Sequence, residues 1–153
     1  MIKIYTDGSA KGNPGNGGYG IVMKFNDLDK EFAQGYRMTT NNRMELLAVI
    51  VALEKIKTNK HHVHVYSDSK YVIDSIVKKW VFGWEQKNFK GKKNIDLWKR
   101  YLKIHSKFNV TYHWVKGHAG HPENERCDVL AVAAADDFNN HLIDTYFEEN
   151  REA

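Results

Sequence analysis

Four acidic residues in this chain stand beside apolar segments, where carboxylates are uncommon. They are Asp7, Glu45, Asp68 and Asp128. Carboxylates that gather at one rim repel one another, so such a cluster persists only when protons or cations neutralise it. Their hard oxygen atoms suit Mg²⁺ or Mn²⁺, and the lack of a Cys/His ligand set argues against structural zinc. We therefore expect a metal site with positions left open for water and phosphate oxygens.

Each acid also has an ordinary structural interpretation. Asp7 precedes a glycine, a common turn pair. Glu45 has capping-box spacing, and Asp68 could cap a helix. Asp128 could be a helix-flank acid. Only their joint placement next to segments that we expect to be buried favours the metal site.

The first part of the chain predicts three strands. Residues 2–5 alternate between apolar and polar side chains and lead into Asp7. Residues 12–18 are so rich in glycine that we expect a loop. Residues 19–25 and 31–36 are the next two strands, joined by a hairpin connection at 26–29. Short connections of this kind predict an antiparallel meander.

The rest of the chain alternates helices and strands. Residues 46–53 lack polar side chains and follow a run of capping residues, which favours a buried helix. Residues 63–66 and 110–115 are expected strands, and 95–104 is an expected helix. Pro122 suits the first position of a last helix.

This order predicts an α/β domain with a mixed five-stranded sheet. Three strands would be antiparallel, two would be parallel, and helices would pack on both faces. If the first and fourth strands are parallel neighbours, Asp7 and Asp68 meet at the same rim of the sheet.

The bulk properties indicate one soluble domain. The chain has 153 residues and 42% hydrophobic residues, and its mean hydropathy is −0.61. No apolar run approaches the roughly 20 residues of a membrane helix. The first strand starts almost at Met1, so we expect no signal peptide. A single cysteine, Cys127, favours a reducing cytoplasm.

Charge is distributed unevenly around a net value of +4. The segment 78–103 is strongly basic, whereas the chain from Asp136 onward is mostly acidic. The basic side chains of the first segment are Lys78, Lys79, Lys87, Lys90, Lys92, Lys93, Lys99, Arg100 and Lys103. A basic segment of this kind is the electrostatic footprint of an acidic partner such as a nucleic acid.

Six blocks of the sequence resemble type 1 ribonuclease H of the bacterial kind. They are YTDGS (5–9), GNPG (12–15), TTNNRME (39–45), YSDS (66–69), WVKGHAGH (114–121) and PENERCD (122–128). The resemblance runs from the first strand to about Ala135. The motif between His118 and Asp128 is its most specific part.

The resemblance implies an endonuclease that cuts the RNA strand of an RNA–DNA hybrid and leaves 5′-phosphate and 3′-hydroxyl ends. It implies that Asp7, Glu45, Asp68 and Asp128 bind metal and that His118 assists. Two Mg²⁺ ions about 4 Å apart would activate water and stabilise the departing 3′ oxygen, with Mn²⁺ as a possible substitute.

Recognition of RNA requires contact with its 2′-hydroxyl groups in the minor groove. By resemblance, Asn13, Asn41, Asn42 and the backbone near Gly8 face these hydroxyls, and amides can both donate and accept.

Several other positions are expected along the DNA strand. Thr40 and Asn94 resemble a pocket that grips one of its phosphates. Residues 80–94 resemble the family's basic protrusion, in which Lys87 and Lys90 neutralise phosphates and Trp84 stacks on a sugar. We expect Trp80 in the core.

The chain departs from the family pattern at a few positions. Lys70 stands where glutamine is common, which places a cation where an amide would read a base edge. Ala10 replaces a frequent cysteine or serine, Phe89 a frequent tryptophan, and the protrusion is short. These differences concern affinity and cleavage preference, because none affects the four acids.

We expect a single catalytic domain over residues 1–146, a flexible tail over 147–153, and a monomer with no membrane partner. Two alternatives remain open. One is a non-catalytic hybrid-binding module, and the other is a different nuclease or strand-transfer enzyme of the same fold.

Overall fold

The computed structural model describes residues 1–117 and 121–151. Its centre is a five-stranded sheet in the order β3-β2-β1-β4-β5. The strands are β1 (Ile2–Ala10), β2 (Gly15–Phe25), β3 (Leu28–Thr39), β4 (Val63–Ser67) and β5 (Val110–Trp114). The pairs β1–β2 and β2–β3 are antiparallel, whereas β1–β4 and β4–β5 are parallel. The predicted mixed sheet is thus confirmed.

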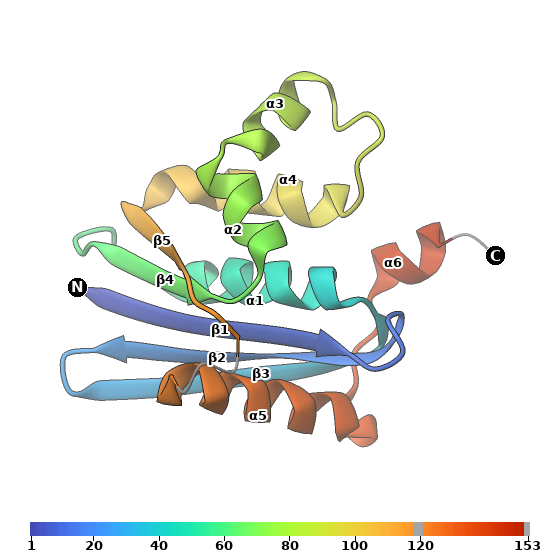
Figure 1. The fold of residues 1–153 in the computed structure, drawn as a ribbon, viewed down its shortest axis with the longest axis horizontal. Coiled ribbons are helices and arrows are strands. Elements are labelled where there is room, and N and C mark those ends of the chain that lie inside the picture. Colours follow the sequence, from blue (N-terminus) through green and yellow to red (C-terminus); the bar gives the residue numbers. More distant parts are fainter. Residues whose placement is uncertain (118–120, 152–153) are drawn as a thin grey trace.

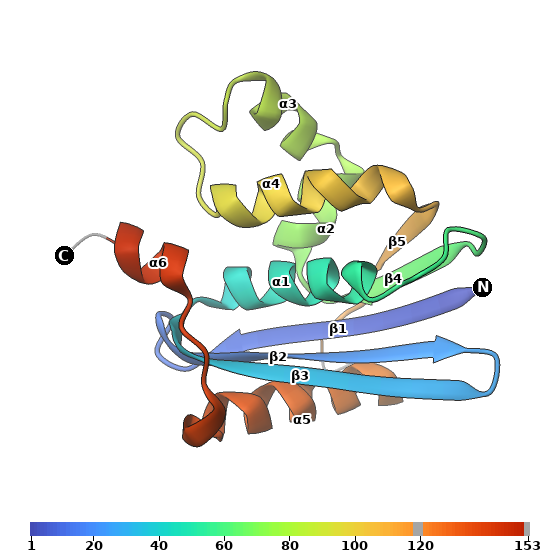
Figure 2. The same cartoon turned by 180° about the vertical axis from the view of Figure 1, so that it is seen from behind.

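Helices cover both faces of the sheet (Figures 1 and 2). They are α1 (Asn41–Glu54), α2 (Lys70–Val77), α3 (Trp80–Gln86), α4 (Ile95–Ile104), α5 (Pro122–Asp136) and α6 (Thr145–Asn150). Helices α1 to α4 lie on one side of the sheet, and α5 lies on the other side against β1, β2 and β3. No helix within the described residues is long and apolar enough to cross a membrane.

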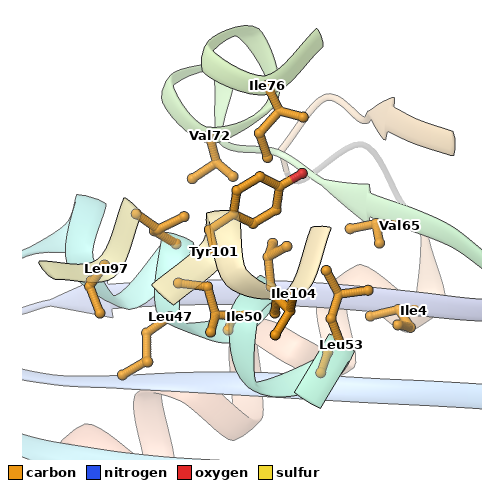
Figure 3. Packing of buried hydrophobic residues seen from close by; sticks show 14 of the residues in the cluster. Ile4, Leu47, Ile50, Leu53, Val65, Val72, Ile76, Leu97, Tyr101 and Ile104 are labelled. Carbon is orange, nitrogen blue, oxygen red and sulfur yellow. The ribbon is translucent and has the colours of Figure 1, made fainter. Parts of the chain in front are cut away.

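The main core lies between the sheet and helix α4, with α1 in the middle (Figure 3). Leu47 and Ile50 of α1 lie between Ile4 of β1 and Tyr101 of α4, and all four are at most 5% exposed. Because α1 is covered on nearly every side, it carries apolar residues around most of its circumference. The predicted buried helix is therefore present at the expected place.

Strand β2 starts earlier than predicted, because it includes glycines that we expected in a loop. A Cβ atom on Gly18 would lie 2.6 Å from the carbonyl oxygen of Ala131, and one on Gly20 would lie 2.3 Å from that of Cys127. The glycines thus let α5 approach the strand at backbone distance. The close packing at these glycines involves a helix more than 100 residues away in the chain. A local turn pattern therefore cannot predict it.

The hairpin between β2 and β3 is also tighter than predicted. Phe25 pairs with Leu28, so only Asn26 and Asp27 form the turn, and Asn26 has a φ of 55°. Two-residue hairpin turns favour asparagine in this left-handed conformation. The prediction missed the start of β3 because Leu28 and its next neighbours are exposed.

The expectation that Trp80 lies in the core is wrong. Its side chain is 47% exposed, whereas Val81 and Phe89 are almost fully buried. The short helix α3 therefore turns Val81 inward, and Phe89 returns to the core after the turn that follows.

The expected domain boundary at residue 146 falls within α6. Arg37 on β3 contacts Glu148 through a bidentate ion pair, with N–O distances of 2.9–3.1 Å. Asp144, directly before the helix, accepts hydrogen bonds from Arg43. These contacts attach α6 to the rest of the domain.

Candidate active site

Asp7 and Asp68 lie at the same rim because β1 and β4 run parallel. The last residues paired between these strands are Tyr5 and Tyr66, and each acid follows two residues later. We expected Asp7 at the end of its strand. This expectation is wrong, because β1 continues to pair with β2 as far as Ala10. The rim is therefore the point where β1 and β4 diverge, which is where ligands bind in open α/β sheets.

Glu45 reaches this rim because α1 crosses β1 at very short range. A Cβ atom on Gly8 would lie only 2.4 Å from the backbone nitrogen of Glu45. Only glycine allows this approach. As a result, one carboxylate oxygen each from Asp7, Glu45 and Asp68 lies within 4.8 Å of the others.

The three carboxyl groups cannot all be ionised without a counter-charge. Burial, followed by the charge of Asp68, raises the pKa of Asp7 to about 7. Burial also raises the pKa of Glu45 well above its ordinary value, and the charges of Asp7 and Asp68 add to this. The Oε2 atom of Glu45 is shielded from solvent and has no hydrogen-bond partner among the described residues. An orphaned buried oxygen facing other carboxylates fits a bound cation.

The capping interpretations of Glu45 and Asp68 do not hold. Thr40 caps α1 by accepting a hydrogen bond from the backbone of Arg43. Ser69 caps α2 by accepting one from the backbone of Val72. Neither acid is needed to cap the helix beside it.

Asp128 completes the rim from the opposite face of the sheet. It lines a hollow of about 410 Å³ together with Asp7, Glu45 and Asp68, although it lies outside their 4.8 Å group. The thiol of Cys127 donates to the carbonyl oxygen of Tyr5 at 3.2 Å, which ties α5 to β1 near the site.

Sequence reasoning missed Asn124, which lies one helical turn before Asp128. It lines an adjoining hollow of about 130 Å³ with Asp7, Asp68 and Asp128. Its Oδ1 atom is buried and has no hydrogen-bond partner among the described residues. The four-residue spacing from Asp128 on a helix was the available signal.

The side chains of Asn13 and Asn41, two of the amides that we expected to contact the substrate, each accept a hydrogen bond from the backbone. The backbone N–H of Asn41 donates to Oδ1 of Asn13 at 2.9 Å, and the backbone N–H of Ala10 donates to Oδ1 of Asn41 at 2.5 Å. Both amide oxygens are therefore used inside the protein. Their NH₂ groups remain as donors, while Asn42 is exposed beside the hollow.

Comparisons with known proteins agree with this geometry. The model of the RNase H family matches residues 1–136. The chain belongs to the RNase H family. It is 55% identical over 139 residues to Ribonuclease H of Desulforamulus reducens, covering 88% of this chain and 87% of that protein. Enzymes of the RNase H family are metal-dependent endoribonucleases, and this chain is one of them.

Two solved structures show the same fold. LC9-RNase H1, a type 1 RNase H with the type 2 active-site motif, is 31% identical and has a TM-score of 0.79, covering 97% of this chain and 79% of that one. LC11-RNase H1 in complex with an RNA/DNA hybrid is 26% identical and has a TM-score of 0.70. The latter match covers 91% of this chain and 99% of the other.

The RNase H chain has a second, larger groove of about 640 Å³ beside the carboxylate rim. It contains the predicted residues Asn13, Thr40, Asn42 and Asn94. Sequence reasoning did not place its other lining residues there, namely Pro14, Arg43, Lys92, Lys93, Tyr146, Phe147, Asn150 and Arg151. Lysine and arginine side chains make this groove suitable for a phosphate group.

The floor of the groove is held by Arg43, which sequence reasoning also missed. Arg43 is 3% exposed and makes ion pairs of 2.6 Å with Asp96 and 2.7 Å with Asp144. Its Nη1 atom also donates to Oδ1 of Asn94 at 3.4 Å, while Nδ2 of Asn94 donates to the hydroxyl of Tyr71 at 3.0 Å. Asn94 is thus fixed by two partners.

The predicted contacts of the RNase H protrusion lie apart from the carboxylates. Lys87 and Lys90 are exposed. Trp84 is half-buried, with its ring edge-on to Trp98 at 5.9 Å and Lys92 lying 4.9 Å over its face.

Lys70 lines the carboxylate hollow and lies 4.8 Å over the ring of Trp114. The indole N–H of Trp114 in turn donates to the backbone oxygen of Asp68 at 3.0 Å. His118, the predicted assisting residue, lies outside the described residues.

Proposed function

We propose that the carboxylate rim is the catalytic site of this RNase H and that it cleaves the RNA strand of RNA–DNA hybrids. The observation that carries the proposal is the buried, unpartnered Oε2 atom of Glu45 beside Asp7 and Asp68. This donor set fits hard divalent cations. We assign the metal-binding role to Asp7, Glu45, Asp68 and Asp128.

We further propose that two Mg²⁺ ions act at this rim, with Mn²⁺ as a substitute. When bound, such ions lower the pKa of an attacking water and stabilise the leaving 3′ oxygen, which gives 5′-phosphate and 3′-hydroxyl ends. The protein's own contribution is to hold three carboxylates at short range against their repulsion. Because protons compete at Asp7 and Glu45, metal affinity should rise with pH.

The amide side chains of Asn13 and Asn41 select the RNA strand. Asn13 and Asn41 use their oxygens internally, so each offers an NH₂ donor to a 2′-hydroxyl oxygen. Gly8 and Asn42 lie at the same hollow and complete the surface that faces the RNA. The LC11-RNase H1 structure, which holds an RNA/DNA hybrid, supports a hybrid as the substrate.

The DNA strand is assigned to the larger groove and the basic segment. Thr40 and Asn94 bind one phosphate there. Lys87, Lys90 and Trp84 follow the same strand along the protrusion. Binding should weaken steeply as salt is raised, because lysine–phosphate contacts release counterions.

Lys70 and His118 keep proposed roles. Lys70 lies at the edge of the carboxylate hollow, where a cation can contact a base or a phosphate. His118 is assigned to proton transfer or product release, because an imidazole can exchange protons near neutral pH.

The organisation of the chain remains part of the proposal. We assign one catalytic domain that extends from residue 1 through α6, which Glu148 attaches to Arg37 of β3, and a monomeric state. A reducing cytoplasm is the proposed location, because Cys127 is the chain's one cysteine and cannot form an internal disulfide.

Cleavage of an end-labelled RNA–DNA hybrid tests the reaction and the site together. DNA duplex, RNA duplex and single-stranded RNA are run alongside, in Mg²⁺ and in EDTA. We expect cutting of only the hybrid's RNA strand in Mg²⁺, lost in Asp7→Asn and retained in Asp29→Asn, an exposed acid of the hairpin. Tight hybrid binding without cutting would indicate a binding module instead, and equal cutting of DNA duplex would contradict the role of the amides.

A further inference from the structure

Helix α6 contributes to the larger groove beside the carboxylate rim. The groove is lined by the start of α1, by residues 92–94 and by α6, which all lie toward the same end of the molecule (Figures 1 and 2). The match to the RNase H family model ends at residue 136, whereas α6 begins at Thr145. Membership of the family therefore does not explain what this last helix does at the groove.

The side chains at the end of the chain are sorted by charge. Those that line the groove are Tyr146, Phe147, Asn150 and Arg151. Their spacing places them on one side of the helix. Glu148 binds Arg37 of β3 instead. Although the end of the chain is rich in acids, no acidic side chain of the described residues lines the groove.

Two cations of the groove have no acidic partner. The charge of Arg43 is neutralised by Asp96 and Asp144. Lys93 and Arg151, in contrast, form no ion pair within residues 1–117 and 121–151. Unpaired cations in a groove without carboxylates attract an anion.

Helix α6 is held in place before any ligand binds. Asp144 caps the helix by accepting a hydrogen bond from the backbone of Phe147 at 3.4 Å. It also accepts one from the hydroxyl of Thr39 at 2.8 Å. The guanidinium carbon of Arg151 lies 5.7 Å from the centre of the Phe147 ring. Because these contacts already restrain the helix and the arginine, less ordering is needed when a ligand binds.

The groove adjoins the carboxylate hollow and has space for more than one phosphate. Asn42 lines both of them. The volume of the groove is about 640 Å³, whereas a phosphate group displaces only a few water molecules of about 30 Å³ each. A phosphate at Thr40 and Asn94 therefore leaves space for a further part of the same strand.

Resting on the assignment of this groove to the DNA strand, we propose that Arg151 and Lys93 bind a second phosphate of that strand. This phosphate is the neighbour of the one at Thr40 and Asn94. The planar guanidinium of arginine can bind two phosphate oxygens at once, and the lysine adds a point charge from another wall of the groove. The last helix is then part of the substrate-binding surface.

Single uncharged linkages in the DNA strand test this assignment. Each hybrid carries one methylphosphonate in place of one DNA phosphate. Its affinity for the full-length Asp7→Asn chain is measured in Mg²⁺, so that the RNA stays intact. We expect neutralisation to weaken binding by about tenfold at each of two adjacent linkages. Added to this chain, Arg151→Met or Lys93→Met should remove the effect at one of these linkages and leave it at the other.

The matched control is Lys57→Met, which removes one charge from an exposed residue beyond the far end of α1. It should leave both linkages sensitive. Compared with this control, Arg151→Met should reduce the slope of log affinity against log salt concentration by about 1, because one phosphate contact is lost. Arg151→Lys keeps the charge and should retain most of the slope, which separates loss of the contact from disturbance of α6.

The same measurements distinguish this inference from the assignment on which it rests. If no uncharged linkage weakens binding to the Asp7→Asn chain, both fail. If one or more linkages matter but Arg151→Met and Lys93→Met give the pattern and slope of Lys57→Met, the DNA strand occupies the groove and the second phosphate site is overturned. Tighter binding by Arg151→Met would also overturn it, because α6 would then restrict access to the groove.

Discussion

Arg43 and Asp144 are 101 residues apart in the chain and share two hydrogen bonds, of 2.7 Å and 2.9 Å. Arg43 is 3% exposed and Asp144 is 8% exposed. Removal of one partner from such a buried pair leaves an uncompensated charge. Arg43→Met should therefore lower the free energy of unfolding by about 3–5 kcal/mol in urea denaturation.

Arg37→Met is the matched control for this prediction. Arg37 also joins β3 to the C-terminal segment, through Glu148, but its side chain is 57% exposed. Exposed ion pairs contribute little to stability, so the urea midpoint should hardly change. Equal losses in both variants would mean that the attachment of α6, and not the buried charge, determines stability.

Asp7→Asn should stabilise the metal-free protein at high pH while it abolishes cleavage. Burial, followed by the charge of Asp68, raises the pKa of Asp7 from its ordinary value of 3.8 to about 7 in the folded chain. The folded state then binds more protons than the unfolded state in this interval, so stability falls as pH rises from about 4 to about 7. Urea unfolding in EDTA should show a gain on the order of 2 kcal/mol for the variant at about pH 8, and little gain at about pH 4.

Addition of Mg²⁺ serves as the control for the Asp7 prediction. Mg²⁺ should stabilise the wild type at high pH and stabilise Asp7→Asn less, because the ion replaces the protons that the carboxylates would otherwise hold. A variant that is no more stable than wild type at any pH would contradict the repulsion between the carboxylates.

Gly20→Ala should weaken both the fold and the metal site. The added Cβ atom would meet the carbonyl oxygen of Cys127 at 2.3 Å, so α5 must move away from β2. We expect a loss of about 1–3 kcal/mol in unfolding free energy. Because Asp128 follows Cys127 on α5, the Mg²⁺ concentration needed for half-maximal cleavage should rise as well.

Gly83→Ala provides the comparison for Gly20→Ala. Nothing lies within 4 Å of the Cβ position at Gly83, which is in α3. This change should stabilise the chain by about 0.5–1 kcal/mol through helix propensity, and leave the Mg²⁺ requirement as it is. If both alanine variants behave alike, close packing of α5 is not what places Asp128.

Asn41→Asp separates the two functions of that amide. A carboxylate oxygen can still accept the hydrogen bond from the backbone of Ala10, but the NH₂ donor is lost. KM for hybrid cleavage should rise about tenfold, the equivalent of one lost hydrogen bond. Asn26→Asp adds the same charge in the β2–β3 turn and should leave KM unchanged, so a similar rise there would indicate general electrostatic repulsion.

The main elements of the fold were predictable because each has a local pattern. Alternation along residues 2–5 and 63–66 indicated β1 and β4, and capping residues before an apolar run indicated α1. Pro122 marked the start of α5, as the structure confirms. We expected Asp7 and Asp68 to meet if β1 and β4 were parallel neighbours, and the structure shows both the parallel pairing and the meeting.

The remaining features depend on contacts between distant segments. Gly18 belongs to a strand although the glycine-rich run around it favours a loop, because α5 lies against it. Arg43 finds its partners Asp96 and Asp144 more than 50 residues away. Lys93 and Arg151 reach one groove from segments that are far apart in the chain. No local pattern of side chains carries this information.

The central position of β1 between α1 and α5 has a consequence during synthesis. A chain that has emerged from the ribosome as far as α4 already contains Asp7, Glu45 and Asp68, but lacks the helix that seals the second face of β1. The carboxylate hollow gains Asp128 only when residues 122–136 arrive, so we expect a nascent chain without α5 to have no nuclease activity. Recovery of nuclease activity during refolding would therefore report the docking of the last long helix.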